Sequence, residues 1–156
     1  MRETFTDRQI IEFVVLIGSR MTLCQVANVG GVSLEDNPQF HYNLGLAYQR
    51  SNEFEEALTE FQNAIDEIED KVQCCIRVAE CSLALNRPDE ALDVVSKGLK
   101  LDALTDEEKL ELNYHLGLSY KAKGDVKKAL KVFTQIQEVD KNYETVDKEI
   151  KDLTKL

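Results

Sequence analysis

Four cysteines and two histidines are the side chains of this 156-residue chain that could bind a metal ion or act as nucleophiles. Their spacing argues against such chemistry, because Cys24, Cys74, Cys75 and Cys81 form no C-x-x-C pair and no ligand ladder with a histidine. Cys74 and Cys81 lie seven residues apart, which on a helix is about 10 Å and too far to share one ion. We therefore predict no metal site and interpret the cysteines as small buried side chains in a reducing compartment.

The histidines and carboxylates show no catalytic arrangement either. His41 and His115 have no evident nucleophile partner, and acidic pairs such as Glu55-Glu56 fall on faces expected to be solvated. The sequence contains neither a G-x-x-x-x-G-K-[ST] phosphate loop nor a G-x-G-x-x-G motif. We therefore predict a protein that is not an enzyme and has no cofactor.

The elements that must position these residues come from an internal repeat. Each copy has the pattern L-G-x-x-Y followed by A-x-x-x-F-x-x-A, and the copies are offset by 34 and then 38 residues. The first copy contains Leu44, Gly45, Tyr48, Ala57, Phe61 and Ala64. The third contains Leu116, Gly117, Tyr120, Ala129, Phe133 and Ile136. A degraded copy between them contains Val78, Ala79, Ser82, Ala91, Val95 and Gly98.

This pattern resembles the tetratricopeptide repeat (TPR) family over about residues 38–143. The resemblance implies an all-α fold, a right-handed superhelix of antiparallel helix pairs in a single domain, with repeats at 38–71, 72–105 and 110–143. Residues 1–37 are expected to form a degenerate N-terminal helix pair. Residues 144–156 are expected to form a capping helix, with Val146, Ile150 and Leu153 as its apolar stripe.

Several local signals indicate where the helices begin and end. Asn52, Asn86 and Gly124 each follow the Gly or Ala of the L-G pair by seven residues, and they suit the left-handed geometry of a helix stop. Asn37 with Pro38 suits the start of the first helix. Thr105 and Glu108 form a capping box within a four-residue insertion, so the third repeat's first helix is predicted to begin one turn early.

Glycines inside two of the predicted helices point to close packing. Gly45 and Gly117 each cost roughly 1 kcal/mol relative to Ala in a helix, which suggests a compensating contact. We expect the backbones of the paired helices to approach each other there, with Ala57 and Ala129, and Ala91 in the second repeat, as the small partners.

The resemblance also implies a concave groove lined by the first helix of each repeat, which binds a peptide. Carried over by position, it implies groove residues in all three repeats. The first repeat would present Gln39, Tyr42, Asn43, Leu46 and Gln49. The second would present Gln73, Ile76, Arg77 and Glu80. The third would present Glu111, Tyr114, His115, Leu118 and Lys121.

Composition and charge restrict the class of partner. The chain has 29 acidic and 19 basic residues, a net charge of -10, so phosphate backbones and anionic membranes are poor partners. The longest apolar stretch, residues 10–17, contains a glutamate and is far shorter than a membrane span of roughly 20 residues. We expect a soluble, cytoplasmic protein with a protein or peptide partner, no nucleic acid and no membrane insertion; a homo-oligomer is compatible with the sequence.

We predict a non-catalytic protein-interaction module, an adaptor or scaffold that holds a peptide in the groove. One alternative is a small acidic export chaperone of the bacterial type III secretion class, and we expect a bacterial source. A second alternative is a self-assembling structural scaffold. A carboxylate clamp built from Arg8, Asn43 and Arg77 fits only in part, because Glu12 and Gln73 depart from that pattern.

Overall fold

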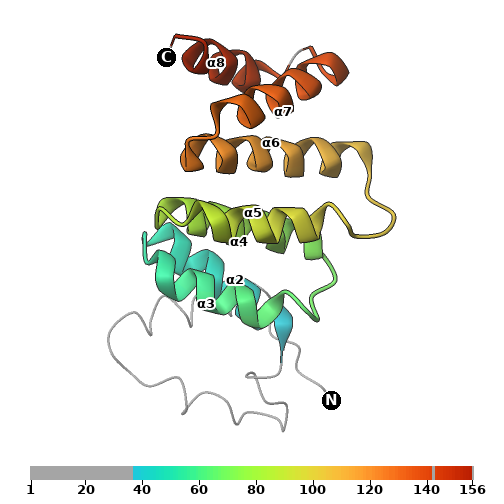
Figure 1. Ribbon diagram of the computed structural model, residues 1–156. Helices are drawn as coiled ribbons and strands as arrows, with labels where there is room; N and C mark the ends of the chain where they lie inside the picture. The colour runs from blue at the N-terminus through green and yellow to red at the C-terminus, as the bar shows by residue number, and fades with distance from the viewer. Residues whose placement is uncertain (1–36, 142, 156) are drawn as a thin grey trace, which may run out of the picture. The chain divides into compact units, whose positions relative to one another are not determined.

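The structure, a computed structural model, describes residues 37–141 and 143–155, and within them it consists of seven α-helices (Figure 1). The predicted all-α fold is therefore confirmed, whereas the expected N-terminal helix pair lies outside the described residues. The helices are α2 (Pro38–Arg50), α3 (Phe54–Ala64), α4 (Lys71–Ala84), α5 (Pro88–Gly98), α6 (Asp106–Lys123), α7 (Val126–Val139) and α8 (Glu144–Leu153). The chain divides into two compact units, Met1–Glu69 and Asp70–Leu156, each described by itself below.

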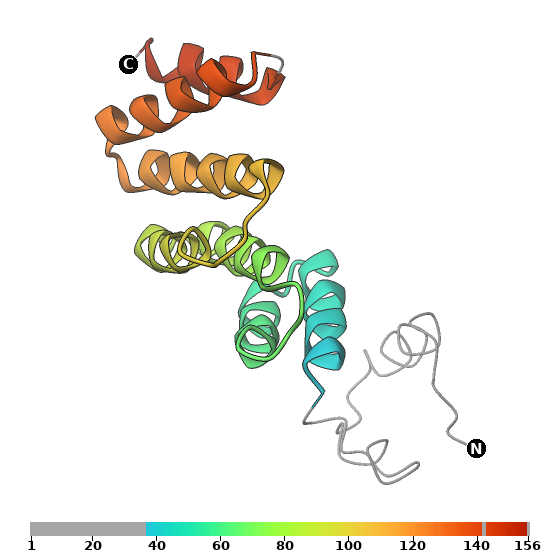
Figure 2. The ribbon, with the colours of Figure 1, turned by 90° about the vertical axis from the view of Figure 1, so that its right-hand side faces the viewer.

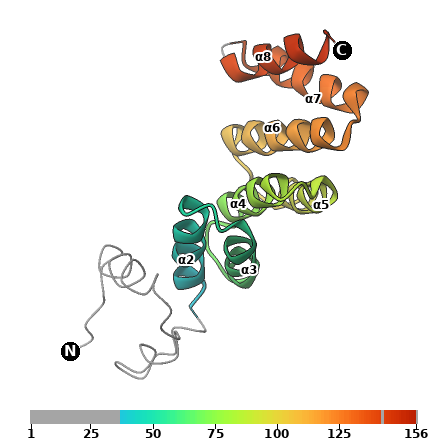
Figure 3. The same ribbon diagram turned by 90° about the vertical axis from the view of Figure 1, so that its left-hand side faces the viewer.

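Unit 1 contains the antiparallel pair α2 and α3, which lie side by side in Figures 2 and 3. The start of α2 is the predicted one, because the Asn37 side chain accepts hydrogen bonds from the backbone N–H groups of Gln39 and Phe40, and Pro38 occupies the first turn. Both helices contribute buried apolar side chains. They are Phe40, Leu44, Ala57, Leu58, Phe61 and Ala64.

Unit 2 contains the pairs α4/α5 and α6/α7, followed by α8. Each helix from α5 to α8 packs against the one before it, and α6 also packs against α4, the first helix of the preceding pair (Figure 3). This arrangement of successive helix pairs brings the first helices of neighbouring pairs next to each other. The residues that α4 and α6 leave at their surface are therefore near neighbours.

The helix stops follow the sequence prediction. Asn52, Asn86 and Gly124 have φ angles of 60°, 57° and 84°, which is the left-handed conformation that Asn and Gly adopt most readily. Ala103, between α5 and α6, has a φ of 58°, which nothing in its residue type predicts. The capping box of Thr105 and Glu108 is present, and α6 has 18 residues against 14 in α4, so the third pair begins one turn early as expected.

A phenylalanine ring lies against two of the helical glycines. A Cβ on Gly45 would lie 2.7 Å from the ring of Phe61, and a Cβ on Gly117 would lie 2.5 Å from the ring of Phe133. Ala57 and Ala129 are fully buried, and their role as small partners of these glycines stays a prediction. An aromatic ring of the second helix occupies the space that a side chain would need, so the L-G and F positions of the pattern depend on each other.

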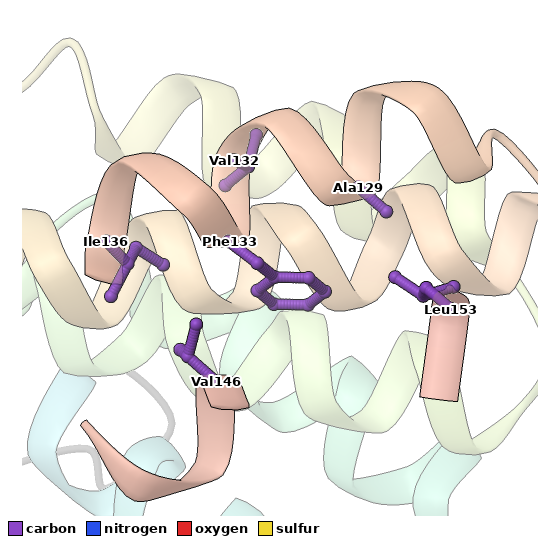
Figure 4. Packing of buried hydrophobic residues seen from close by; sticks show 6 residues of the cluster. All are labelled: Ala129, Val132, Phe133, Ile136, Val146 and Leu153. Carbon is purple, nitrogen blue, oxygen red and sulfur yellow. The ribbon is translucent and has the colours of Figure 1, made fainter. Parts of the chain in front are cut away.

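The predicted capping helix is confirmed by α8, which packs along α7. Val146 and Leu153 are buried against a cluster formed by Ala129, Val132, Phe133 and Ile136 of α7 (Figure 4). Ile150 packs on the same cluster and is partly exposed. The stripe therefore closes the apolar end of the last pair, while the rest of α8 is polar.

Candidate functional site

The fourteen predicted groove residues are divided between the two units. Five of them lie on α2, in unit 1, and nine lie on α4 and α6, in unit 2. Each group is therefore described separately.

On α2, the predicted residues combine surface and core contacts. Gln39 is exposed, and its side-chain amide donates a hydrogen bond of 3.2 Å to the Asn43 Oδ1 atom. Tyr42, Leu46 and Gln49 are partly exposed. The Tyr42 ring lies 5.6 Å from the ring of Phe61, centroid to centroid, so this tyrosine also packs on the core of the pair.

On α4 and α6, seven predicted residues are partly exposed and form one continuous surface. Within each helix they are spaced by three and four residues, which places them on a single face. The side-chain amide of Gln73 on α4 donates a hydrogen bond of 3.1 Å to the Glu111 carboxylate on α6, which joins the two faces. We call this the α4/α6 surface. It consists of Gln73, Arg77, Glu80, Glu111, Tyr114, Leu118 and Lys121.

Ion pairs order most of the charged groups on the α4/α6 surface. The Arg77 guanidinium lies 2.8 Å from the Glu80 carboxylate, one turn along α4. The Lys121 ammonium lies 2.5 Å from the Glu149 carboxylate of α8, so the capping helix borders the same surface. The Glu111 carboxylate, by contrast, accepts its hydrogen bond from a neutral amide.

Tyr114 is the centre of an aromatic cluster at this surface. Its ring centroid lies 5.7 Å from that of Tyr143 and 6.0 Å from that of the buried Phe133. Burial raises the pKa of Tyr143, and the negative charges of Glu111 and Asp140 raise it further. Tyr143 was not among the predicted residues; its only sequence signal is an aromatic residue directly before the capping helix.

Two predicted groove residues are buried, and their assignment to the groove is corrected here. Ile76 is only 1% exposed, because an apolar side chain with no polar tip packs entirely into the interior of the unit. His115 is 8% exposed, and its Nδ1 atom has no hydrogen-bond partner among the described residues. Burial lowers the pKa of His115, whereas Glu80 and Glu111 act in the opposite direction.

The described cysteines are buried thiols. Cys74, Cys75 and Cys81 all lie on α4 and are at most 4% exposed. Burial raises the pKa of Cys74 to about 12 and that of Cys81 to about 11, so neither is an activated nucleophile. Within residues 37–141 and 143–155, no group of three or more His, Cys, Asp or Glu side chains is arranged to hold a metal ion. Arg8 of the partial carboxylate clamp, like Cys24, lies outside the described residues.

Two family models match the sequence. The model of a tetratricopeptide repeat matches residues 110–143, which cover α6 and α7. The chain therefore contains a tetratricopeptide repeat in this segment. A model of subunit 3 of the anaphase-promoting complex, or cyclosome, matches residues 27–98. TPR domains typically have no catalytic activity and mediate protein or peptide binding. No curated protein has a significantly similar sequence.

Solved TPR structures share the fold at low sequence identity. The second TPR domain of the human RPAP3 protein, solved in complex with an HSP70 peptide, matches with a TM-score of 0.64 and 13% identity, over 76% of this chain and 98% of that one. YrrB, a TPR protein with an unusual peptide-binding site, has a TM-score of 0.62 and 20% identity, over 90% of this chain and 72% of that one. A double mutant of MamA has a TM-score of 0.70 and 14% identity, over 94% and 74%.

One part of the localisation prediction can be compared with the structure. Among the described residues, each helix is too short or too polar to cross a membrane. The cytoplasmic location and the bacterial source stay predictions.

Proposed function

We propose that this chain is a non-catalytic adaptor or scaffold that binds a peptide segment of a partner protein on the α4/α6 surface. The observation that carries the proposal is the Gln73–Glu111 hydrogen bond, which joins partly exposed side chains of two neighbouring first helices into one surface. The five predicted residues of α2 lie in unit 1 and remain a separate prediction.

The composition of the α4/α6 surface supports peptide binding. Tyr114 and Leu118 provide apolar area backed by the buried α7–α8 cluster, and amide and charged groups surround them. Apolar side chains supply burial in such an interface, while polar groups orient the peptide backbone. The matched domain of RPAP3 was solved with a peptide, and YrrB is described by its peptide-binding site, so the fold is suited to this role.

Selection of random 12-residue peptides on the purified chain, followed by NMR mapping, tests the proposal. We expect selected peptides to shift the backbone amide signals of α4 and α6, and to leave those of the exposed α7 residues Thr134 and Gln135 unchanged. Failure to select any peptide, or shifts confined to other helices, would contradict it. Light scattering on the same samples detects self-assembly; a mass that grows with concentration together with shifts at the chain's ends would favour the structural scaffold instead.

A matched pair of leucine variants separates binding from stability. Leu118 and Leu130 are both partly buried and both pack on the α7–α8 cluster, but only Leu118 belongs to the α4/α6 surface. We expect Leu118→Ala and Leu130→Ala to lose similar stability, and only Leu118→Ala to weaken peptide binding. Equal loss of binding in both variants would mean that the peptide does not contact this surface.

A further inference from the structure

Glu111 differs from Glu80 and Glu149 in forming no ion pair among the described residues. Glu80 is paired with Arg77, and Glu149 is paired with Lys121. Glu111 accepts a hydrogen bond from the neutral amide of Gln73, and no ion pair to it is present in the described part of the chain. A carboxylate without an ion-pair partner can form a charge-assisted hydrogen bond with a cationic ligand.

Two tyrosine rings lie beside this carboxylate. Tyr114 and Tyr143 are both partly exposed, with ring centroids 5.7 Å apart and ring planes inclined by 48°. Glu111 precedes Tyr114 by three residues on α6, so the two side chains lie on the same helix face. The negative charge of Glu111 also raises the pKa of Tyr143, after burial, and that of Glu149 raises the pKa of Tyr114 in the same way. The face of an aromatic ring carries partial negative charge and attracts ammonium and guanidinium groups.

We infer that Tyr114, Tyr143 and Glu111 together form a receptor for the cationic side chain of a lysine or arginine in the bound peptide. The inference rests on the proposed peptide-binding function and names the chemistry of its ligand. The Lys121 ammonium, the nearest cation of this surface on α6, is held by Glu149.

The neighbouring repeats lack this combination, which gives the receptor a defined place along the peptide. In the second repeat the positions of Glu111, Tyr114 and Tyr143 are taken by Gln73, Ile76 and Thr105. Ile76 is buried, so that copy offers neither a ring nor a carboxylate. A single cation-specific position would set the register in which an extended peptide lies on the α4/α6 surface.

A small probe tests the receptor without any peptide. The tyrosine ring signals are followed by NMR while Nα-acetyl-lysine methylamide is added, and the norleucine analogue serves as the uncharged control. We expect the lysine probe to shift the Tyr114 and Tyr143 signals in a saturable way at millimolar concentration, and the norleucine probe to leave them unchanged. Equal shifts with both probes, or no saturable shift with either, would overturn the inference.

Matched variants identify the groups that recognise the cation. Glu111→Gln removes the charge and keeps an oxygen for the Gln73 amide, so we expect the fold to be retained and the lysine probe to bind about three- to tenfold more weakly. Glu138→Gln, on the exposed part of α7, is the control and should bind like the wild type. Tyr143→Phe keeps an aromatic face and should keep most of the affinity, whereas Tyr143→Leu should lose it. Unchanged binding in both Glu111→Gln and Tyr143→Leu would contradict the assignment.

Peptides then separate this inference from the proposed function. Ten-residue peptide mixtures carry lysine, norleucine or glutamate at a fixed central position. Preference for lysine that is lost in Glu111→Gln and weakened by 500 mM NaCl supports both ideas. Binding without charge preference would retain the peptide-binding function and overturn the receptor. A saturable response to the small probe with no peptide binding at all would retain the receptor and overturn the function.

Discussion

In the α6/α7 pair the ring of Phe133 lies against Gly117, whereas the α4/α5 pair has Ala79 and Val95 at the same repeat positions, both fully buried. The α2/α3 pair resembles α6/α7, with Phe61 against Gly45. In the α4/α5 pair, Ala79 of the first helix adds a methyl group at the glycine position, and Val95 of the second helix replaces the phenylalanine ring. The second copy of the pattern is therefore degraded in sequence but consistent in packing, because the two positions compensate each other.

The first helices of the α4/α5 and α6/α7 pairs also differ in how many of their residues are buried. Eight residues of α4 are buried, against four residues of the longer α6. Ile76 and Arg77 of α4 correspond by position to Tyr114 and His115 of α6. Ile76 is buried in α4, whereas Tyr114 is partly exposed in α6. Arg77 carries a permanent charge, whereas His115 at the same repeat position is a buried imidazole. Repeat position alone therefore does not determine exposure.

The largest effect is expected from filling the space beside the Phe133 ring. Gly117→Ala would place a methyl group where the ring lies, and we expect it to lower the free energy of unfolding by about 2–3 kcal/mol. Combining it with Phe133→Val reproduces the residues of the second pair. The double variant should be more stable than the sum of the two single changes predicts, by about 1 kcal/mol or more.

Urea unfolding followed by circular dichroism measures these differences. Gln135→Ala on the exposed face of α7 is the control and should change stability by less than about 0.5 kcal/mol. If the stability changes of Gly117→Ala and Phe133→Val were strictly additive, the two positions would not compensate each other, and this explanation of the second pair would be wrong.

The second prediction concerns the helix starts, where the pairs also differ. Thr105 and Glu108 cap α6 reciprocally, while Asp70 caps α4 with a single hydrogen bond to the Gln73 backbone. We expect Thr105→Ala to cost about 1–2 kcal/mol, and Asp70→Ala to cost less, about 1 kcal/mol. Thermal melting of both variants tests the order. A larger loss in Asp70→Ala would contradict the role assigned to the reciprocal cap.

The third prediction uses pH to distinguish His115 from its counterpart Arg77. The pKa of His115 is lowered by burial, so below the ordinary histidine value of about 6.5 the unfolded chain binds a proton that the folded chain resists. Stability should therefore fall as the pH decreases from 7.5 to 5.5, by up to about 1 kcal/mol from this group. His115→Gln should remove this part of the decrease and His41→Gln should retain it. An identical pH profile for wild type and His115→Gln would exclude the buried neutral state.

The smallest effect is expected at Ala103, which adopts a left-handed φ where the helix stops use Asn or Gly. Ala103→Gly removes the steric conflict but increases the freedom of the unfolded chain, so we expect a gain of about 0.5 kcal/mol. Ala122→Gly within α6 makes the same chemical change at a helical position and should lose about 1 kcal/mol. A loss in both variants would show that the Ala103 backbone is not strained.

The features that the sequence predicted are those that short segments determine. The stops at Asn52, Asn86 and Gly124 depend on which residues tolerate a left-handed backbone, and the Thr105 cap depends on two residues three apart. The α8 stripe depends on helical periodicity. Each of these signals lies within a few residues, so the all-α fold, the three helix stops and the start of α6 could be predicted without tertiary information.

The missed features depend on contacts between distant segments. Phe133 is sixteen residues from Gly117, and only the paired helices bring them together. The burial of Ile76 and His115 likewise follows from what packs on α4 and α6, which repeat position does not specify. Ala103 gave no signal, because alanine has no preference for the conformation that the α5–α6 connection imposes. Tyr143 reaches the candidate site from the next element of the chain.

The early start of α6 shows where a series of helix pairs tolerates the insertion of residues. By repeat position α6 begins three residues earlier than α4, and these residues, Asp106, Glu107 and Glu108, are exposed or partly exposed. Inside each pair the spacing from the Gly or Ala position to the stop residue is constant at seven residues. Insertions and deletions in descendants of this sequence should therefore accumulate between helix pairs and be rare within them.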